Sequence, residues 1–197
     1  MRFFCLFFLA QCALAQSVNT GADEKIWALT HPLAAAQVKK IYKSALPIYK
    51  QTAKDSILDK YASGGSLDAY RHCFMMAAFA QKINLKKIRR LGELHEKSNY
   101  RNFQNSINEN GELPDSLSTV MDLYNNEIGF AIGKKNVSLS LQALSDMVIK
   151  QINQGLALKM KRNKKGEYLD CEGHLIQLKK YPHTWNIPKC LVPTDQD

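Results

Sequence analysis

The 197-residue sequence has only five cysteines, ten glycines and two tryptophans. It contains no glycine-rich phosphate-binding loop, no GxSxG nucleophile elbow and no internal repeat. These absences exclude a P-loop nucleotide-binding protein, a serine hydrolase of the usual elbow type and a solenoid array. The chain is 45% hydrophobic and 23% charged, so it is neither disordered nor of low complexity. It can bury the core of one domain.

The first fifteen residues, MRFFCLFFLAQCALA, combine one positive charge with an apolar run and end in Ala-Leu-Ala. This arrangement is typical of a cleavable signal peptide. The apolar run, roughly twelve residues, is shorter than the ~20 needed to span a bilayer, and no later segment approaches that length. The sequence therefore predicts cleavage near Ala15 and a secreted or periplasmic protein without a transmembrane segment. Lipidation at Cys12 is less favoured, because Gln11 stands where lipid-attachment signals have a small residue.

The chain carries 27 basic and 18 acidic residues, a formal net charge of +9, which falls by one when Arg2 leaves with the signal peptide. A basic protein favours anionic partners. The lysines and arginines are scattered, however, and no motif specific for DNA or RNA organises them. Two interpretations remain open, an unknown anionic substrate or ligand and an ordinary solvated surface.

Three cysteines follow the predicted signal peptide. In an oxidising compartment Cys171 and Cys190 can form a disulfide that closes a loop in the C-terminal segment. Cys73 lies on an apolar helix face and is expected to be a buried thiol.

Hydrophobic periodicity predicts a mainly α, bundle-like domain over residues 16–155, followed by a small antiparallel β appendage, a hairpin or meander, over 156–197. Pro32 suits the first turn of the N-terminal helix, and Pro47 is expected to break or bend that helix. An Asn- and Ser-rich loop is expected over 98–111. Helices are expected over residues 26–61, 67–83, 85–97, 117–133 and 138–155, with Ser66 as the N-cap of the second. Strands are expected over 156–162, 167–171 and 174–181.

Polar side chains lie on helix faces that should otherwise be apolar. Asp68 and His72 are four residues apart and share one face of the second helix. In the third helix, His95 is expected to point inward and Glu96 to lie at the edge of the apolar stripe. The fourth helix has a stripe of polar and small residues in which the glycines permit close approach of another helix: Ser118, Asp122, Asn125, Gly129 and Gly133, with Asn126 beside it.

Burying so many polar groups is unfavourable unless they pair or hold a ligand. Two neutral imidazoles with carboxylates form a suitable ligand set for Zn²⁺, Mn²⁺ or Fe²⁺, with positions left for water. The interpretation assigns the metal to Asp68, His72, His95 and Asp122. Glu96 would take a proton from the bound water, and Asn125 or Asn126 would orient water or substrate.

Two interpretations without a metal remain open. Asp68 could orient His72 as a general base, or the polar residues could form a hydrogen-bonded core network that only stabilises the fold. A pocket that binds a ligand without chemistry is a further alternative.

The runs GGSLDAYRHCFMMAAFAQKI, RRLGELHEKSNY and LPDSLSTVMDLYNNEIGFAIG span roughly residues 60–135 and resemble an uncharacterised bacterial domain family with the motif order DAxRH, HE and DxxNN. Related domains occur in secreted proteins and at the C-termini of polymorphic-toxin-like chains. Because the function of the family is unknown, the resemblance implies only its motif positions in this chain: Asp68, His72, His95, Glu96, Asp122 and Asn126.

The order His72, His95-Glu96 and Asp122 also looks like the H, HD, D arrangement of the HD-type metal phosphohydrolases. Here the dyad is His-Glu, and Asp68 is additional, so the likeness is an analogy for what such ligand sets do. Together these observations predict a secreted metal-dependent hydrolase of an anionic ester or phosphoester. The alternatives are a non-catalytic envelope or binding protein and, because related domains occur in polymorphic-toxin-like chains, a toxin-like activity.

Overall fold

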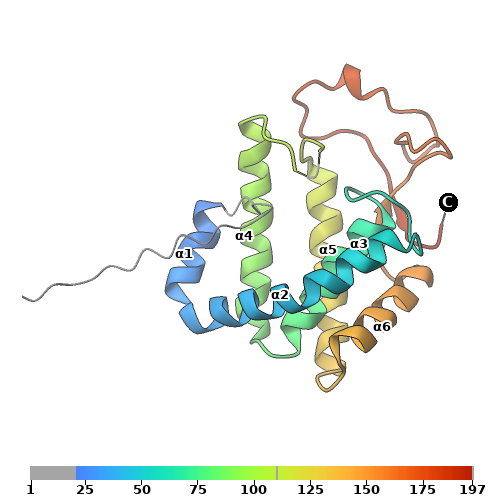
Figure 1. Ribbon diagram of the computed structural model, residues 1–197. Helices are drawn as coiled ribbons and strands as arrows, with labels where there is room; N and C mark the ends of the chain where they lie inside the picture. The colour runs from blue at the N-terminus through green and yellow to red at the C-terminus, as the bar shows by residue number, and fades with distance from the viewer. Residues whose placement is uncertain (1–20, 110, 197) are drawn as a thin grey trace, which may run out of the picture.

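The computed structural model describes residues 21–109 and 111–196. In this part of the chain six α-helices are followed by a short 3-10 helix and a two-stranded antiparallel sheet near the C-terminus (Figure 1). The fold is mainly α, as the sequence predicts. The predicted signal peptide lies outside the described residues. No helix in the described ranges is long and apolar enough to cross a bilayer.

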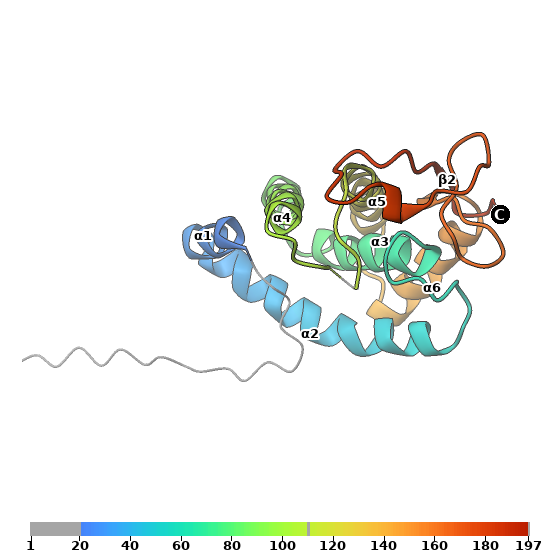
Figure 2. The same ribbon diagram turned by 90° about the horizontal axis from the view of Figure 1, so that it is seen from above.

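The N-terminal helices are α1, Ala22–Thr30, and α2, Pro32–Lys54, with Pro32 as the first residue of its helix. The two helices separate at His31. Proline removes one backbone donor and crowds the preceding turn, yet α2 continues through Pro47 to its end. Of the two outcomes expected at Pro47, the structure has the single helix, and Figure 2 shows α2 bending along its course.

Helix α3, Ser66–Ala80, is buried over almost its whole length and forms the centre of the domain. Its beginning is fixed from outside the helix, because the Asp59 carboxylate accepts the amide protons of Ser66 at 2.6 Å and of Leu67 at 3.3 Å. A carboxylate at this end stabilises the free amides and the positive pole of the helix. The predicted N-cap, Ser66, is thus the first helical residue.

Helix α5, Ser116–Lys135, packs against α3 with the two backbones in contact. A Cβ added at Gly129 would lie 2.4 Å from the carbonyl oxygen of Cys73, and one added at Gly133 would lie 2.1 Å from that of Ala77. The predicted close approach at these glycines is confirmed, and it brings the polar faces of the two helices together.

Helices α4, Leu85–Gln104, and α6, Leu141–Asn153, flank this central pair. Figure 2 shows α4 and α5 almost end-on, with α2 and α3 running across them. The loop predicted from residue 98 was wrong, because α4 continues to Gln104. The rings of Tyr100 and Phe103 lie 4.9 and 5.0 Å from the ring of Trp185, and this aromatic contact covers the last turns of α4.

The C-terminal segment contains less sheet than predicted. Strand β1, Leu158–Met160, pairs with β2, Leu191–Pro193, so the partner of β1 comes from the chain end. The strands predicted over 167–171 and 174–181 form only single bridges, Arg162 with Tyr168 and Leu169 with Leu175. Leu178–Lys180 is the 3-10 helix.

The disulfide between Cys171 and Cys190 is present, as the sequence predicts. It connects the loop of the C-terminal segment to the chain just before β2. Cys73 is a buried free thiol, which is also as predicted.

Candidate metal centre

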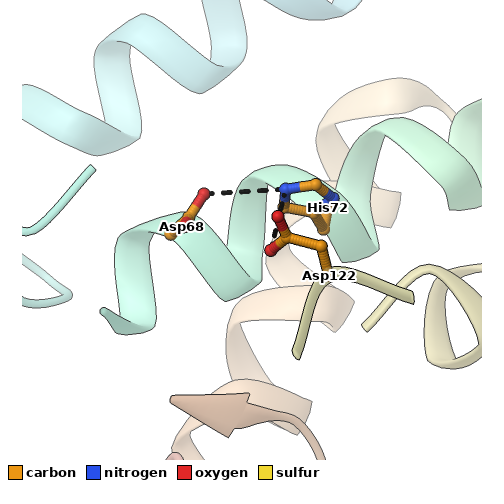
Figure 3. Close-up of side chains that lie close together, drawn as sticks. All are labelled: Asp68, His72 and Asp122. Atoms are coloured by element: carbon orange, nitrogen blue, oxygen red, sulfur yellow. Dashed lines mark ion pairs between the residues drawn. The ribbon is translucent and has the colours of Figure 1, made fainter. Parts of the chain in front are cut away.

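Three side chains from α3 and α5 converge in the interior (Figure 3). The Nε2 atom of His72 lies 3.1 Å from Asp122 Oδ1 and 3.7 Å from Asp68 Oδ1. Each of the three residues offers a ligand atom within 4.8 Å of the other two, and all three side chains are buried. The helical spacing of Asp68 and His72 and the backbone contact between α3 and α5 therefore produce the convergence that the sequence predicts for these three residues.

The orientation of the His72 ring is set by Asn126. The Nδ1 atom of His72 lies 3.0 Å from Asn126 Oδ1, and an amide oxygen can only accept, so Nδ1 carries the proton. Burial, together with the neighbouring Arg71, holds the pKa of His72 well below its usual range, so the ring is neutral. Its Nε2 lone pair then faces the two carboxylates. Metal-binding histidines are commonly oriented in the same way, by an oxygen that accepts a hydrogen bond from the other ring nitrogen.

The Asp122 carboxylate is not satisfied by the protein. Its Oδ1 atom makes no hydrogen bond to the described residues, although it lies 3.1 Å from the Nε2 atom of His72. Burial, with the nearby carboxylates Asp68 and Glu96, raises the pKa of Asp122 well above its usual range. Two acceptors at 3.1 Å repel each other unless a proton or a cation lies between them.

A guanidinium group already lies beside two of the three ligand atoms. One terminal nitrogen of Arg71 is 2.6 Å from Asp68 Oδ1 and 2.9 Å from His72 Nε2. The other Asp68 oxygen accepts the amide proton of Gly64 at 2.8 Å. Burial raises the pKa of Asp68, and Arg71 acts against that shift. Arg71 is the sequence neighbour of His72, yet the sequence interpretation gave it no role.

Glu96 is buried, only 4% exposed, so the predicted position at the edge of the apolar stripe was wrong. One carboxylate oxygen accepts a hydrogen bond from Asn99 at 3.3 Å, and the other makes none within the described structure. Burial raises the pKa of Glu96 to about 7, with Glu109 adding to the shift and His95 opposing it. Such a carboxyl group is suited to accept a proton near neutral pH.

His95 is not in the convergent group. Its Nδ1 atom lies 2.9 Å from Glu24 Oε1 and its Nε2 atom 3.3 Å from Glu109 Oε1. Burial alone would lower the pKa of His95, but the two carboxylates override that effect and raise the pKa well above its usual range. The ring is therefore a protonated cation with both nitrogens engaged, an arrangement unlike that of a metal ligand. Glu24 and Glu109 were not foreseen.

Asn125 has a different task from Asn126. Its side-chain amide donates to the carbonyl oxygen of Leu158 at 3.0 Å and accepts the amide proton of the same residue at 2.9 Å. Both polar atoms are used in holding β1 against α5, and neither is left to orient water or substrate.

A small cavity adjoins the carboxylates of Asp68 and Asp122. Its volume, taken as the space open to the centre of a water-sized sphere, is about 20 Å³. This is room for a water molecule but not for an organic substrate. Five carboxylates and two cations line this cavity, so its walls carry an excess of negative charge: Asp68, Glu109, Glu112, Asp115 and Asp122 against Arg71 and Lys189.

The C-terminal segment supplies part of the cavity wall. Lys189 Nζ lies 2.6 Å from Asp115 Oδ2, with both side chains almost fully buried, and 3.9 Å from the centre of the Tyr168 ring. Asp115 also accepts the amide protons of Leu117 and Ser118 in the first turn of α5. No local pattern in the sequence indicated this pair, because the partners are 74 residues apart.

A second group with metal-ligand atoms lies at the start of the disulfide-closed loop, around Cys171: Asp170, Glu172 and His174. Glu172 and His174 are exposed. Asp170 accepts hydrogen bonds from the backbone amide of His174 at 2.7 Å and from its ring at 3.1 Å. The group is therefore accounted for as a hydrogen-bonded surface turn.

A family model described as "Domain of unknown function (DUF6973)" matches residues 25–156. The matched range contains Asp68, Arg71, His72, Glu96, Asp122 and Asn126. No curated protein and no solved structure matches the chain.

Proposed function

The chain belongs to this family, whose function is unknown. From the site alone, we propose that the protein is a metal-dependent hydrolase of an anionic ester or phosphoester. The observation that carries the proposal is the 3.1 Å contact between two acceptor atoms, His72 Nε2 and Asp122 Oδ1, of which Oδ1 makes no hydrogen bond to the described residues. A divalent cation held by these two atoms would remove the repulsion between them, and Asp68 would be its third ligand.

The donor set fits Zn²⁺, Mn²⁺ or Fe²⁺. One imidazole and two carboxylates leave coordination positions for water, and such a set is common to these ions. The cavity beside the carboxylates has room for that water. Its excess of carboxylates also favours a cation electrostatically. When bound, the ion would acidify the water that attacks the substrate.

The residues of the chain have separate roles in this proposal. Asp68, His72 and Asp122 hold the ion, and Asn126 keeps the proton of His72 on Nδ1. Glu96, whose pKa is about 7, accepts the proton that the attacking water releases. The cavity is too small for a substrate, so the scissile group would have to approach from the cavity rim, where Arg71 is the partly exposed cation.

We place the protein outside the cytoplasm, secreted or periplasmic after cleavage near Ala15. The apolar leader MRFFCLFFLAQCALA supports this assignment. So does the disulfide between Cys171 and Cys190, because such bonds persist in oxidising compartments. The net charge of +9 is consistent with an anionic substrate.

A non-catalytic role is the second candidate, and one observation favours it. Arg71 donates to both Asp68 and His72, so two of the three converging residues have a partner without any metal. In that case the cluster would serve the stability of a helical envelope or binding protein.

Metal titration of the purified protein distinguishes the two candidates. We expect about one equivalent of Zn²⁺ or Mn²⁺ to bind, and Asp122→Asn to weaken binding by more than tenfold, since the substitution removes a ligand charge while keeping the side-chain shape. Asp146→Asn, an exposed aspartate on α6, is the control. Hydrolysis of a chromogenic phosphoester or carboxylic ester should stop with chelator and with Asp122→Asn. Absence of metal binding, with thermal unfolding unchanged by chelator, would leave the structural role.

A further inference from the structure

Arg71 lies where the proposed ion would lie, and this inference rests on the proposed function. Its terminal nitrogen is 2.6 Å from Asp68 Oδ1 and 2.9 Å from His72 Nε2, while those two atoms are 3.7 Å apart. An ion bonded to Asp68 Oδ1 and His72 Nε2 at the usual ~2.0–2.2 Å would lie within about 3 Å of the Arg71 nitrogen, whether it sat on the same side of those two atoms as the nitrogen or on the opposite side. Two cations cannot share that space, so Arg71 and the ion exclude each other.

We propose that Arg71 is an internal competitor for the metal site, a built-in counter-ion that occupies Asp68 and His72 until a divalent cation displaces it. The guanidinium satisfies the buried carboxylate in the absence of metal, a state that would otherwise leave an uncompensated charge in the core. The cost is a lower apparent affinity for the ion, because binding requires the arginine to leave.

The displaced side chain would have carboxylates on its outer side. Arg71 lines the cavity together with Glu109 and Glu112, and its side chain is 25% exposed, whereas those of Asp68 and His72 are 5% exposed. The guanidinium can therefore move outward toward carboxylates already at the cavity wall, whereas the ligands stay in place. In that outer position it meets an anionic substrate at the rim, where planar bidentate recognition of a phosphate or carboxylate suits arginine.

The competition is specific to this arginine. Arg89 also makes two hydrogen bonds to a carboxylate, with Glu127 at 2.6 and 2.7 Å, but that pair is exposed on the surface and touches no ligand of the proposed ion. Arg89→Met is therefore a matched control, because it removes an arginine–carboxylate pair of similar geometry and the same formal charge.

The test measures Zn²⁺ and Mn²⁺ affinity of the full protein by competition with a chromophoric chelator. We expect Arg71→Met to bind at least tenfold more tightly than the unsubstituted protein and Arg89→Met to bind as the unsubstituted protein does. Added metal should also raise the melting temperature of Arg71→Met by more than that of the unsubstituted protein. Equal or weaker binding by Arg71→Met overturns the competition.

Arg71→Lys keeps the inference testable if Arg71→Met does not fold. A lysine has one nitrogen and cannot reproduce the fork that contacts Asp68 twice, so we expect metal affinity above that of the unsubstituted protein. Affinity at or below that level contradicts the inference. Binding that is lost in Asp122→Asn but unchanged in the Arg71 variants refutes only the role of Arg71. No binding by any variant refutes the proposed function as well.

Discussion

Glu96 gives the most direct test of the electrostatics around the site. Its carboxyl group is buried, and burial raises its pKa from the usual 4.5 to about 7. The unfolded chain releases this proton at its ordinary pKa, whereas the folded chain keeps it up to about pH 7. The favourable contribution of proton binding is therefore complete below about pH 4.5 and is lost as the pH rises to about 7.

The size of the effect follows from the difference between the two pKa values. One pKa unit corresponds to about 1.4 kcal/mol, so the free energy of unfolding should lose about 3 kcal/mol between pH 4.5 and 7.5 through this single group. Glu96→Gln has no proton to lose, and its amide oxygen can still accept the hydrogen bond from Asn99. The variant should therefore gain about 3 kcal/mol relative to the unsubstituted protein across this window.

Urea unfolding at four pH values between 4.5 and 7.5, with chelator present, measures this difference. Glu93→Gln is the control, because Glu93 lies one turn earlier on α4 with a 44% exposed side chain. Parallel pH profiles for the unsubstituted protein and Glu96→Gln would refute the reasoning about burial. The same variant should lose hydrolysis while it gains stability, as expected where a strained group is kept for its chemistry.

Two further substitutions probe the scaffold. Gly133→Ala should destabilise the fold by about 1–3 kcal/mol or more, measured as a lower urea midpoint, because its Cβ would lie 2.1 Å from the backbone oxygen of Ala77. An unchanged midpoint would mean that the two helix backbones do not touch there. Lys189→Met should cost about 3–5 kcal/mol in thermal unfolding by leaving Asp115 buried and unpaired, and Asp115→Asn in the same chain should restore much of that loss. No recovery in the double variant would show that Lys189 acts through packing alone.

The parts of the site that could be predicted are those that depend on one helix or on one helix contact. Asp68 and His72 follow from a spacing of four, and Asp122 follows because Gly129 and Gly133 bring α5 onto α3. These constraints are local or periodic. They are visible in the sequence without knowledge of the rest of the chain.

The orientation of α4 could not be predicted in the same way. A single apolar stripe through Ile88 and Leu91 predicted that His95 faces inward and that Glu96 lies at the edge of the stripe. In the structure α1 packs against the same helix and Glu24 contacts His95, so α4 is covered from more than one side. Hydrophobic periodicity indicates one buried face of a helix and does not show that a second helix covers another face. The position of Glu96 was therefore predicted wrongly.

The partners contributed by distant segments had no sequence signal at all. Glu24 is 71 residues from His95, and Lys189 is 74 residues from Asp115. Arg71 was different, because it stands next to His72 within the recognised motif. Its role was missed because the ligand set was chosen for carboxylates and imidazoles alone, without asking which cation would balance them in the absence of metal.

The cavity beside Asp68 and Asp122 is lined by residues from inside the family match and by residues from the segment that follows it. The family match ends at residue 156, so the ligands come from the shared domain, whereas Met160 and Lys189 on the cavity wall come from the stretch beyond it. A relative that kept the helices and exchanged this tail would keep the three converging residues and change the cavity wall beside them. Under the proposed function, the residues that hold the ion and the residues of the cavity wall would then vary independently. In this chain the disulfide joins Cys190, the neighbour of Lys189, to Cys171 in the C-terminal segment.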